Sequence, residues 1–165
     1  MSKLLEPTKV KYFFSILFDM KSHGPSDIET IVLEKIREIH SFEPQFNPLT
    51  EYYSKEMGDN LKRVIYYSLV PESRNLFVPL KLWATEKEIH HSLDNLRTLN
   101  IDVGYVAKEQ VLLATGKPYS HRIFLESGIY AELVYFFKEK TFHKVPWTYP
   151  DYQHQEKIDF FNRIR

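Results

Sequence analysis

The sequence predicts a single α+β domain over residues 1–165, with a mostly antiparallel sheet and helices packed on one face. We expect a ferredoxin-like core followed by a C-terminal hairpin and a terminal helix. The expected elements run strand, helix, strand, strand, helix, then several strands and a last helix. Short turns join successive strands, which implies antiparallel pairing. No repeat, low-complexity segment or linker divides the chain, whose length suits one domain with a substantial core.

The first strand is expected over residues 10–18, where apolar side chains fall on both faces, as in an interior strand. A His-Gly-Pro loop follows at residues 23–25. Ser26, with Glu29 three positions later, has the capping-box pattern that begins a helix. Apolar residues at helical spacing extend this predicted helix to Ile39.

In the middle of the chain, some segments indicate their secondary structure more clearly than others. Residues 46–57 are ambiguous because Pro48 blocks a long helix, and an extended edge strand followed by a loop is the expected structure. Residues 61–70 form the next strand, since β-branched and aromatic residues dominate there. Residues 72–96 carry an apolar stripe at helical spacing, and Pro79 delays or kinks the predicted helix.

The C-terminal third is expected to contain most of the remaining strands. Residues 100–105 form a short strand or loop, and residues 108–114 a brief helix. Residues 121–125 and 129–137 flank Glu-Ser-Gly, which predicts a β-hairpin because glycine supplies the backbone angle of a short loop. A further strand at 141–145 precedes a terminal helix over residues 153–165.

Composition excludes several classes of protein and site. The 22 basic residues balance the 22 acidic ones, so nucleic acid is an unlikely main partner. The absence of cysteine excludes disulfides, thiolate zinc sites and thiol nucleophiles. No stretch approaches the roughly 20 apolar residues of a membrane span, and the N-terminus has no signal-peptide pattern. We therefore expect a soluble, cytoplasmic protein with no membrane partner.

Four unusual segments carry a family resemblance. They are EYYSKEMGDNLKR at 51–63, NIDVGY at 100–105, LLATGKPYSHRIFLESGIYAE at 112–132, and WTYPDYQHQEKIDFFNRIR at 147–165. Together they resemble the bacterial family catalogued as domain of unknown function 4416, over nearly the whole chain. Val103 departs from the family pattern, which has proline there. The resemblance implies one compact domain and supplies neither a reaction nor a cofactor.

A Gly-Lys pair at residues 116–117 is similar to part of a nucleotide-binding loop. The phosphate loop requires G-x-x-x-x-G-K-[ST], because several backbone N–H groups must wrap the phosphates. Here position 111 is valine and position 118 is proline, so the signature fails. We expect a turn, in which Lys117 is a point charge that an anionic ligand can meet.

The predicted hairpin places Arg122 opposite Glu132 on one face of the sheet, and His121 on the other face with Ile123 and Leu125. One interpretation is structural, a cross-strand ion pair worth under about 1 kcal/mol if exposed. The other is functional: Arg122 clamps a carboxylate or phosphate with its fork of donors, while His121 and Glu132 act as catalytic acid and base. The sequence leaves both open.

Further acids lie in the unusual segments, in or beside turns and strand ends, where sites are commonly built. These are Glu56, Asp102 and Asp151. Two carboxylates near a histidine could perform acid–base work or bind a divalent metal. No H-x-x-x-H, H-x-H or D-x-D spacing occurs, so we predict no metal ligands and assign Asp102 to ligand binding.

The segment VPWTYPDY at residues 145–152 holds three aromatic residues and two prolines, so it suits neither a helix interior nor a central strand. We interpret it as an extended strap, anchored by Trp147 and Tyr149, that closes over the sheet beside the hairpin. Asp151 would then cap the final helix. Alternatively, a ligand pocket lies beneath the strap, where Trp147 and Tyr149 contact the flat part of the ligand.

Three functional hypotheses follow. The first is a protein that binds a small anionic ligand or nucleotide, and that could be an enzyme acting on it; its cofactor and oligomeric state are unknown. The second is a non-catalytic protein-interaction module, which would expose an aromatic patch. The third is an RNA binder that stacks bases on sheet aromatics, which the neutral charge disfavours.

Overall fold

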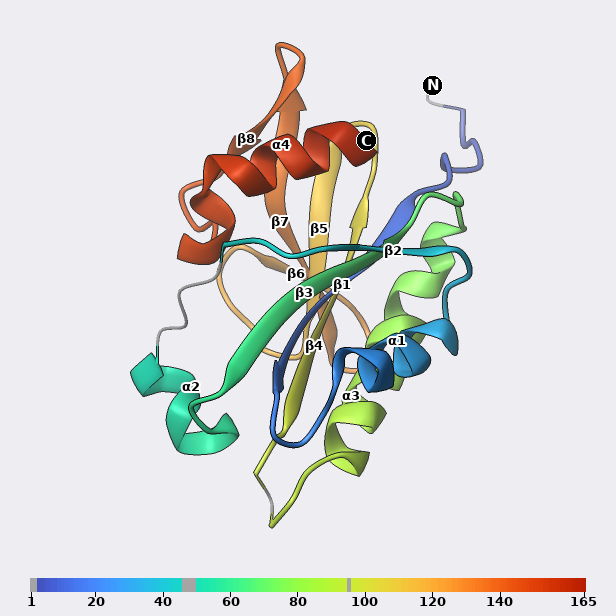
Figure 1. Ribbon diagram of the computed structural model, residues 1–165. Coiled ribbons are helices and arrows are strands. Elements are labelled where there is room, and N and C mark those ends of the chain that lie inside the picture. The colour runs from blue at the N-terminus through green and yellow to red at the C-terminus, as the bar shows by residue number, and fades with distance from the viewer. Residues whose placement is uncertain (1–2, 46–49, 95) are drawn as a thin grey trace.

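The computed structural model describes residues 3–45, 50–94 and 96–165 (Figure 1). The helices are α1 (Pro25–Leu33), α2 (Thr50–Met57), α3 (Phe77–His90) and α4 (Gln155–Ile164), with short 3-10 helices η1 (Arg74–Leu76) and η2 (Pro150–Gln153). The strands are β1 (Lys11–Asp19), β2 (Ile39–Phe42), β3 (Leu61–Ser68), β4 (Leu99–Val106), β5 (Gln110–Thr115), β6 (Arg122–Glu126), β7 (Ile129–Lys138) and β8 (Thr141–Lys144).

The strands form one eight-stranded antiparallel sheet in the order β2-β3-β1-β4-β5-β7-β6, and β8 also pairs with β7. Its first half has the order β2-β3-β1-β4 with helices after β1 and β3, which is the ferredoxin-like arrangement. The predicted α+β class and antiparallel sheet are confirmed. The β5 to β8 strands extend this core beyond β4.

Strand β1 lies inside the sheet because both of its faces are apolar. Phe14 and Ile16 point into one core, and Phe13 points into another on the opposite face. Neighbouring strands β3 and β4 hydrogen-bond to its two edges. A strand that is apolar on both faces needs cover on both, which fixes its central position.

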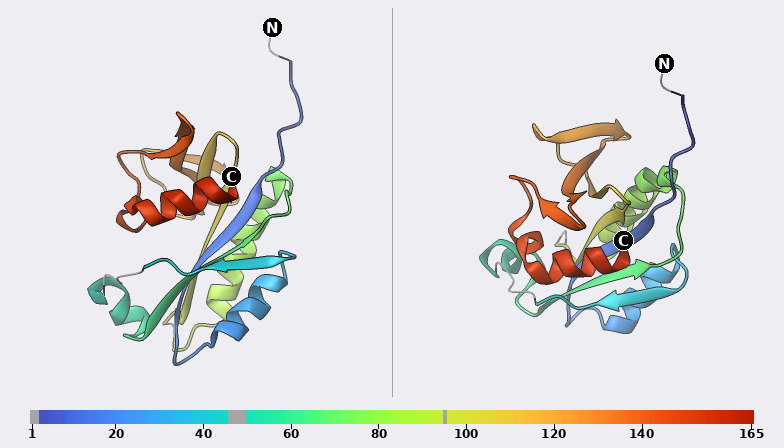
Figure 2. Two further views of the ribbon diagram at one scale, coloured as in Figure 1. Left: turned by 45° about the horizontal axis from the view of Figure 1, so that its top comes forward. Right: turned by 90° about the horizontal axis from the view of Figure 1, so that it is seen from above.

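Helices cover both faces of the sheet, and Figure 2 shows them on opposite sides. Helices α1 and α3 pack on one face, as predicted. Helix α4 packs on the other face, through Phe160 and Phe161 against Phe13, Ile65 and other strand residues. The prediction that all helices share one face therefore needs correction for α4. We call this second side of the sheet the α4 face.

Helix α1 begins and ends earlier than the sequence pattern predicted. Gly24, rather than Ser26, is the N-cap, and its N–H donates to Oδ2 of Asp27 at 2.7 Å. The helix ends at Leu33, and Ile39 belongs to β2 instead of continuing it. The apolar spacing extended beyond the helix because Ile36 and Ile39 also contact the core on that side.

Residues 108–114, predicted as a brief helix, form most of β5. The segment Gln-Val-Leu-Leu-Ala-Thr pairs with β4 on one edge and β7 on the other. The pairing with β7 joins residues that are distant in the sequence, so tertiary contacts override a weak local pattern. Residues 100–105, left as strand or loop, lie within β4.

Residues 50–57 form helix α2, where the sequence predicted an extended segment and a loop. Residues 46–49 and Pro48 in that prediction lie outside the described residues. In α3, Pro79 occupies the first turn, where its missing N–H costs no helical hydrogen bond, so the helix begins at Phe77 and continues through it.

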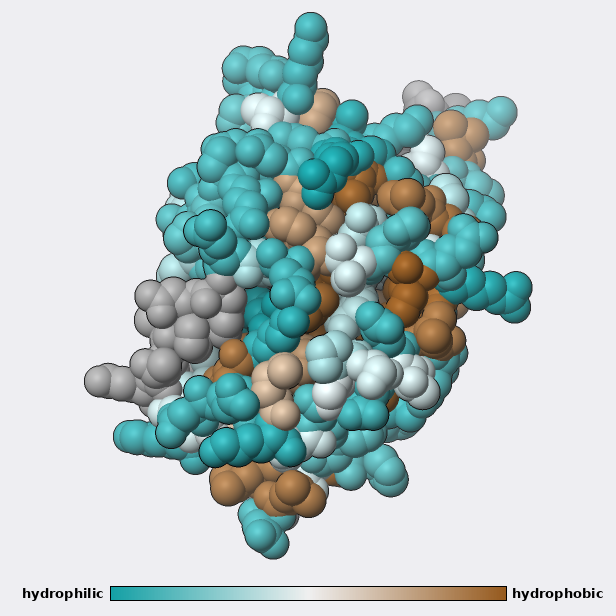
Figure 3. Space-filling view, viewed as in Figure 1, coloured by the Kyte–Doolittle hydropathy of each residue, from teal (hydrophilic) through white to brown (hydrophobic). Residues whose placement is uncertain are grey.

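The predicted hairpin is confirmed as β6 and β7, with Arg122 opposite Glu132, and β8 follows as expected. The terminal helix is α4. In Figure 3, hydrophilic side chains cover most of the visible surface and hydrophobic ones gather in separate patches. Within the described residues, no helix is long and apolar enough to cross a membrane.

Candidate functional site

Strand register brings polar side chains together on the α4 face. Ser15 lies directly opposite Asp102, and Leu17 lies opposite Arg63. Because residues two apart share a face, all of these lie on the same side as Phe13. Further along the sheet, Glu132 shares this side with Val134 in the α4 core.

Four charged side chains form the first group, which we call the buried ion cluster: Arg63, Asp102, Asp151 and Lys157. Arg63 Nη1 lies 3.6 Å from Oδ2 of Asp102, and its Nε lies 3.5 Å from Oδ2 of Asp151. The same Oδ2 of Asp151 is 2.5 Å from Nζ of Lys157. Arg63 also donates through Nη1 to Ser15 Oγ at 2.9 Å, which ties the cluster to β1.

The cluster has its cations inside and its acids outside. The side chains of Arg63 and Lys157 are 4% and 1% exposed, whereas those of Asp102 and Asp151 are 38% and 27% exposed. Burial lowers the pKa of Lys157 to about 8, although Asp151 opposes that effect. Solvent therefore meets carboxylates first and positive charge behind them.

The ring of Tyr152 packs against this cluster. Its ring lies 4.4 Å from Nζ of Lys157, within the range of a cation–π contact. Burial raises the pKa of Tyr152 well above its ordinary value, and the negative charge of Asp102 adds to that effect. The phenol is consequently neutral at physiological pH.

The second group, the hairpin cluster, consists of Arg122, Glu132, Tyr149, His121 and Trp147. Arg122 Nε donates to Oε2 of Glu132 at 2.6 Å, and Arg122 Nη2 donates to the Tyr149 hydroxyl at 2.7 Å. That hydroxyl donates in turn to Oε2 of Glu132 at 3.1 Å. Burial and the Glu132 carboxylate raise the pKa of Tyr149 to about 12, so it stays protonated and can donate.

His121 and Trp147 complete the hairpin cluster by stacking on each other. Their ring centroids are 4.7 Å apart with an interplanar angle of 11°. The prediction that His121 lies on the opposite face from Glu132 is wrong, because His121 belongs to the turn before β6, where strand alternation does not apply. Nε2 of His121 lies 3.5 Å from Oε1 of Glu132, and Trp147 Nε1 donates to the Leu133 carbonyl at 2.9 Å. The strap over residues 147–152 is thereby anchored beside the hairpin, as its aromatic residues predicted.

A third pairing lies at the edge of this region, between Arg97 and Glu56 of α2. Arg97 donates through Nε and Nη2 to the two carboxylate oxygens at 2.6 and 2.8 Å, a bidentate pair. The Arg97 hydrogen bonds, with its charge and that of Lys117, lower the pKa of Glu56 against an opposing effect of burial. Lys117 therefore lies near this carboxylate.

The four segments that carry the family resemblance thus converge on the α4 face. Residues 51–63 supply Arg63, residues 100–105 supply Asp102, and the other two supply the hairpin cluster with Asp151 and Lys157. Asp102 connects the two clusters electrostatically, because its charge raises the pKa of both Tyr149 and Tyr152.

The predicted site residues fall into three places. His121, Arg122, Glu132, Trp147 and Tyr149 meet in the hairpin cluster. Asp102 lies in the neighbouring buried ion cluster. Lys117 contributes its carbonyl oxygen to Arg122 Nη1 at 2.9 Å, while its side chain is exposed.

Asp151 has a different role from the one predicted. The N-cap of α4 is His154, and Asp151 lies in η2, where it pairs with Lys157 and Arg63. Asp151 is the second residue of the short 3-10 helix η2, which ends before α4 begins. Its carboxylate therefore does not reach the first turn of α4 and points toward the buried cations instead.

Sequence reasoning missed Arg63 and Lys157, the two buried cations. Each had a weak signal. Arg63 alternates with the apolar residues Leu61 and Ile65 along its strand, and Lys157 shares the helical phase of Phe161 and Ile164, which are buried. A cation at an apolar position of an amphipathic element indicates a buried partner.

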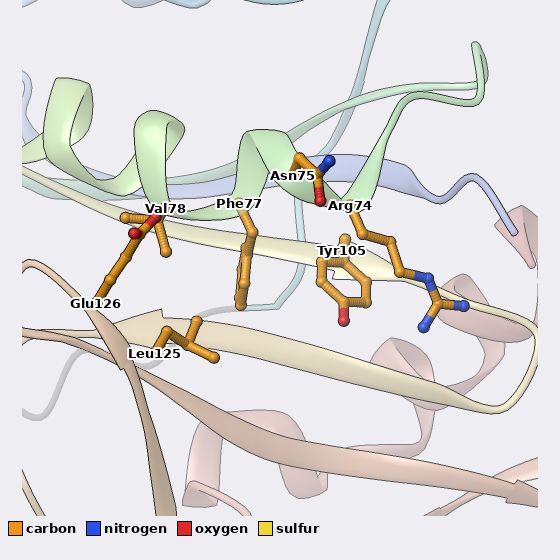
Figure 4. A pocket seen from close by; sticks show the side chains of 7 residues that line it. All are labelled: Arg74, Asn75, Phe77, Val78, Tyr105, Leu125 and Glu126. Carbon is orange, nitrogen blue, oxygen red and sulfur yellow. The ribbon is translucent and has the colours of Figure 1, made fainter. Parts of the chain in front are cut away.

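Among the described residues, no three histidine or acidic side chains lie close enough to hold a metal ion. A shallow pocket of about 400 Å³ lies away from both clusters, between α3 and β6 (Figure 4). Phe77, Tyr105 and Leu125 line its middle, with Glu126 and Arg74 toward its two ends. It contains none of the predicted site residues.

Comparison with known proteins gives a family and no closer relative. Neither the curated proteins nor the solved structures contain a significant match. A family model described as "Domain of unknown function (DUF4416)" matches residues 8–165, which include every residue of both clusters. The chain therefore belongs to the DUF4416 family.

Proposed function

We propose that this protein binds a small polar ligand on the α4 face of its sheet, where Asp102, Asp151 and Tyr149 meet it. The observation that carries the proposal is the order of charge in the buried ion cluster. Two half-exposed carboxylates face solvent, and two buried cations hold them from behind. Buried charges of this kind are expensive to maintain, and such clusters concentrate at functional sites.

The position of the acids determines which ligand chemistry fits. Carboxylate oxygens accept hydrogen bonds and attract positive charge. A ligand that presents amine, amide or hydroxyl donors to Asp102 and Asp151 would add bonds without breaking any that the protein makes. The pairing with Arg63 and Lys157 restrains these carboxylates, so little ordering remains to be done on binding.

The sequence predicted that an anionic group of the ligand binds Arg122, and this proposal places that group elsewhere. Arg122 already donates to Glu132, to Tyr149 and to the Lys117 carbonyl, so an anion there would compete with internal acceptors. The exposed ammonium of Lys117, near Glu56, is better placed for it. We therefore propose a ligand with donor groups at Asp102 and Asp151 and an anionic group toward Lys117.

If the ligand is a substrate, proton transfer falls to the accessible acids. The side chains of Asp102 and Asp151 are 38% and 27% exposed, whereas those of His121 and Glu132 are 14% and 2% exposed. His121 stacks on Trp147 and faces Glu132, an arrangement that suits orientation of the strap. The acid–base pair proposed for catalysis is thus Asp102 with Asp151.

A protein-interaction module is the second candidate, because apolar side chains on β6 are exposed to solvent. An RNA-recognition role has less support, since α4 covers part of the sheet face that an RNA-recognition motif leaves open for bases. We keep a cytoplasmic location within this proposal, supported by the absence of cysteine.

A thermal-shift screen tests the proposal, using amino acids, nucleotides, sugar phosphates and short dicarboxylates. Ligand at about 100 times its dissociation constant adds about 2.7 kcal/mol to folding stability, which raises Tm by a few degrees. The Asp102→Asn variant should lose that shift. The matched control is Asp159→Asn, an exposed α4 acid that accepts a hydrogen bond from Gln155.

Two outcomes would count against the proposal. One is a screen in which no compound shifts the wild-type Tm. The other is a shift that Asp102→Asn and Asp159→Asn retain equally, which would place the ligand elsewhere on the protein.

A further inference from the structure

The β6 strand at the end of the sheet exposes a run of apolar side chains. Ile123, Phe124 and Leu125 are 70%, 58% and 38% exposed. In the described part of the chain, β6 pairs with β7 on one edge only. An edge strand with an exposed apolar run is a template for another strand, and soluble proteins normally avoid it.

The N-terminal arm has complementary exposure. Leu4 and Leu5 are 95% and 77% exposed. In Figures 1 and 2 the arm extends away from the body of the domain before the chain enters β1. The arm is attached to the domain at Thr8, whose carbonyl and hydroxyl oxygens accept hydrogen bonds from Arg74 at 2.9 and 3.0 Å. The Val10–Glu72 bridge follows directly, with backbone hydrogen bonds of 2.9 and 2.8 Å.

We propose that residues 3–6 of one copy of this chain pair as an antiparallel strand with the outer edge of β6 in a second copy. The register follows from matching the two apolar runs and the charges of Lys3 and Glu126 at one end. It places Glu6 opposite Arg122, Leu5 opposite Ile123, Leu4 opposite Phe124, and Lys3 opposite the irregular pair Leu125–Glu126.

The sheet face on which each side chain lies also supports this register. Residues directly opposite in a sheet share a face. Pairing of β6 with β7 shifts between Phe124 and Glu126, so Leu125 and Glu126 both turn toward the pocket of Figure 4. Lys3 therefore meets Glu126 on that face. Glu6 lies on the other face opposite Arg122, whose donors are already used by Glu132, Tyr149 and the Lys117 carbonyl, so the register depends on the Lys3–Glu126 pair.

The proposed pairing is small, so the dimer should be weak. Each arm contributes four residues, and exchange of both arms about a two-fold axis repeats the same contact twice. Contacts burying less than about 1,200 Å² are characteristic of transient association. We expect a monomer–dimer equilibrium that moves with protein concentration. The Lys3–Glu126 pair lies outside both clusters, so reversing its charges leaves the proposed ligand contacts unchanged.

Sedimentation velocity over about a hundred-fold range of protein concentration tests this pairing, with a charge-reversal cycle. The wild type should show a mean sedimentation coefficient that rises with concentration. Lys3→Glu and Glu126→Lys should each weaken dimerisation about tenfold or less, as expected for one solvent-exposed ion pair in each of two contacts. The double variant Lys3→Glu/Glu126→Lys should restore it.

Glu29→Lys is the matched control, because Glu29 is an exposed acid on α1 and lies outside the proposed contact. It should dimerise like the wild type. The proposal is overturned if the wild type stays monomeric throughout the range. It is equally overturned if the double variant fails to recover the dimer, or if Glu29→Lys weakens it as much as Glu126→Lys.

Discussion

Replacing Lys157 by methionine removes a buried ammonium from α4 and keeps most of the length and apolar surface of the side chain. Lys157 is 1% exposed, and its Nζ lies 2.5 Å from Oδ2 of Asp151. The acid left behind keeps its contact with Arg63 and is itself 27% exposed, so water can solvate it. Apolar replacement of one buried charge is therefore expected to leave stability at pH 7 unchanged or higher.

The effect of pH on stability is the sharper part of this prediction. Burial lowers the folded-state pKa of Lys157 from 10.5 to about 8. Between these values the unfolded chain holds a proton that the folded chain has released, so stability rises as pH rises. From about pH 7 to about pH 9.5 this group should add about 2 kcal/mol to wild-type stability, at 1.36 kcal/mol per pKa unit. The methionine variant lacks this gain.

Urea denaturation followed by tryptophan fluorescence measures the difference at each pH. The advantage of Lys157→Met over the wild type should shrink by about 2 kcal/mol between the two conditions. Lys138→Met, at a lysine whose side chain is 65% exposed, is the control and should follow the wild type at both pH values. If Lys157→Met and the wild type respond identically to pH, Lys157 does not titrate as the buried cluster requires.

Two further substitutions test the hairpin cluster and the packing of β4. Arg122→Ala leaves the 2%-exposed carboxylate of Glu132 without its cation. The free energy of unfolding, measured by urea denaturation, should fall by about 3 kcal/mol. A fall of less than about 1 kcal/mol would mean that solvent screens the pair. Gly104→Ala places a Cβ 2.2 Å from Cζ of Phe13 and 2.8 Å from a backbone oxygen, so we expect a loss of about 3 kcal/mol and a lower Tm. Gly116→Ala, with open space around the added Cβ, should leave Tm unchanged.

The hairpin cluster shows how far local patterns can predict a site. The Glu-Ser-Gly segment predicted a hairpin with Arg122 opposite Glu132, and this pairing is confirmed although Glu126 itself belongs to β6 and the register shifts between Phe124 and Glu126. Tyr149 and Trp147 could be assigned to a strap beside that hairpin because prolines excluded a helix or central strand. Their hydrogen bonds to Glu132 and Leu133 were not predictable, since they depend on where the strap crosses β7.

The buried ion cluster could not be predicted from local sequence patterns. Its members come from β3, β4, η2 and α4, and the hydrogen bond from Arg63 to Ser15 joins residues 48 positions apart. No local spacing relates these residues. A single sequence marks Arg63 and Lys157 only as cations at otherwise apolar positions.

The sequence by itself determined the α+β class, the ferredoxin-like order of the first half, the hairpin and the terminal helix, because each depends on periodicity and turns over short stretches. Tertiary structure decided that residues 110–115 form β5, that α4 covers the second face, and that Asp151 turns inward to Lys157. The physical reason is burial: strands that are apolar on both faces need a second cover, and charges carried inside by that cover need partners.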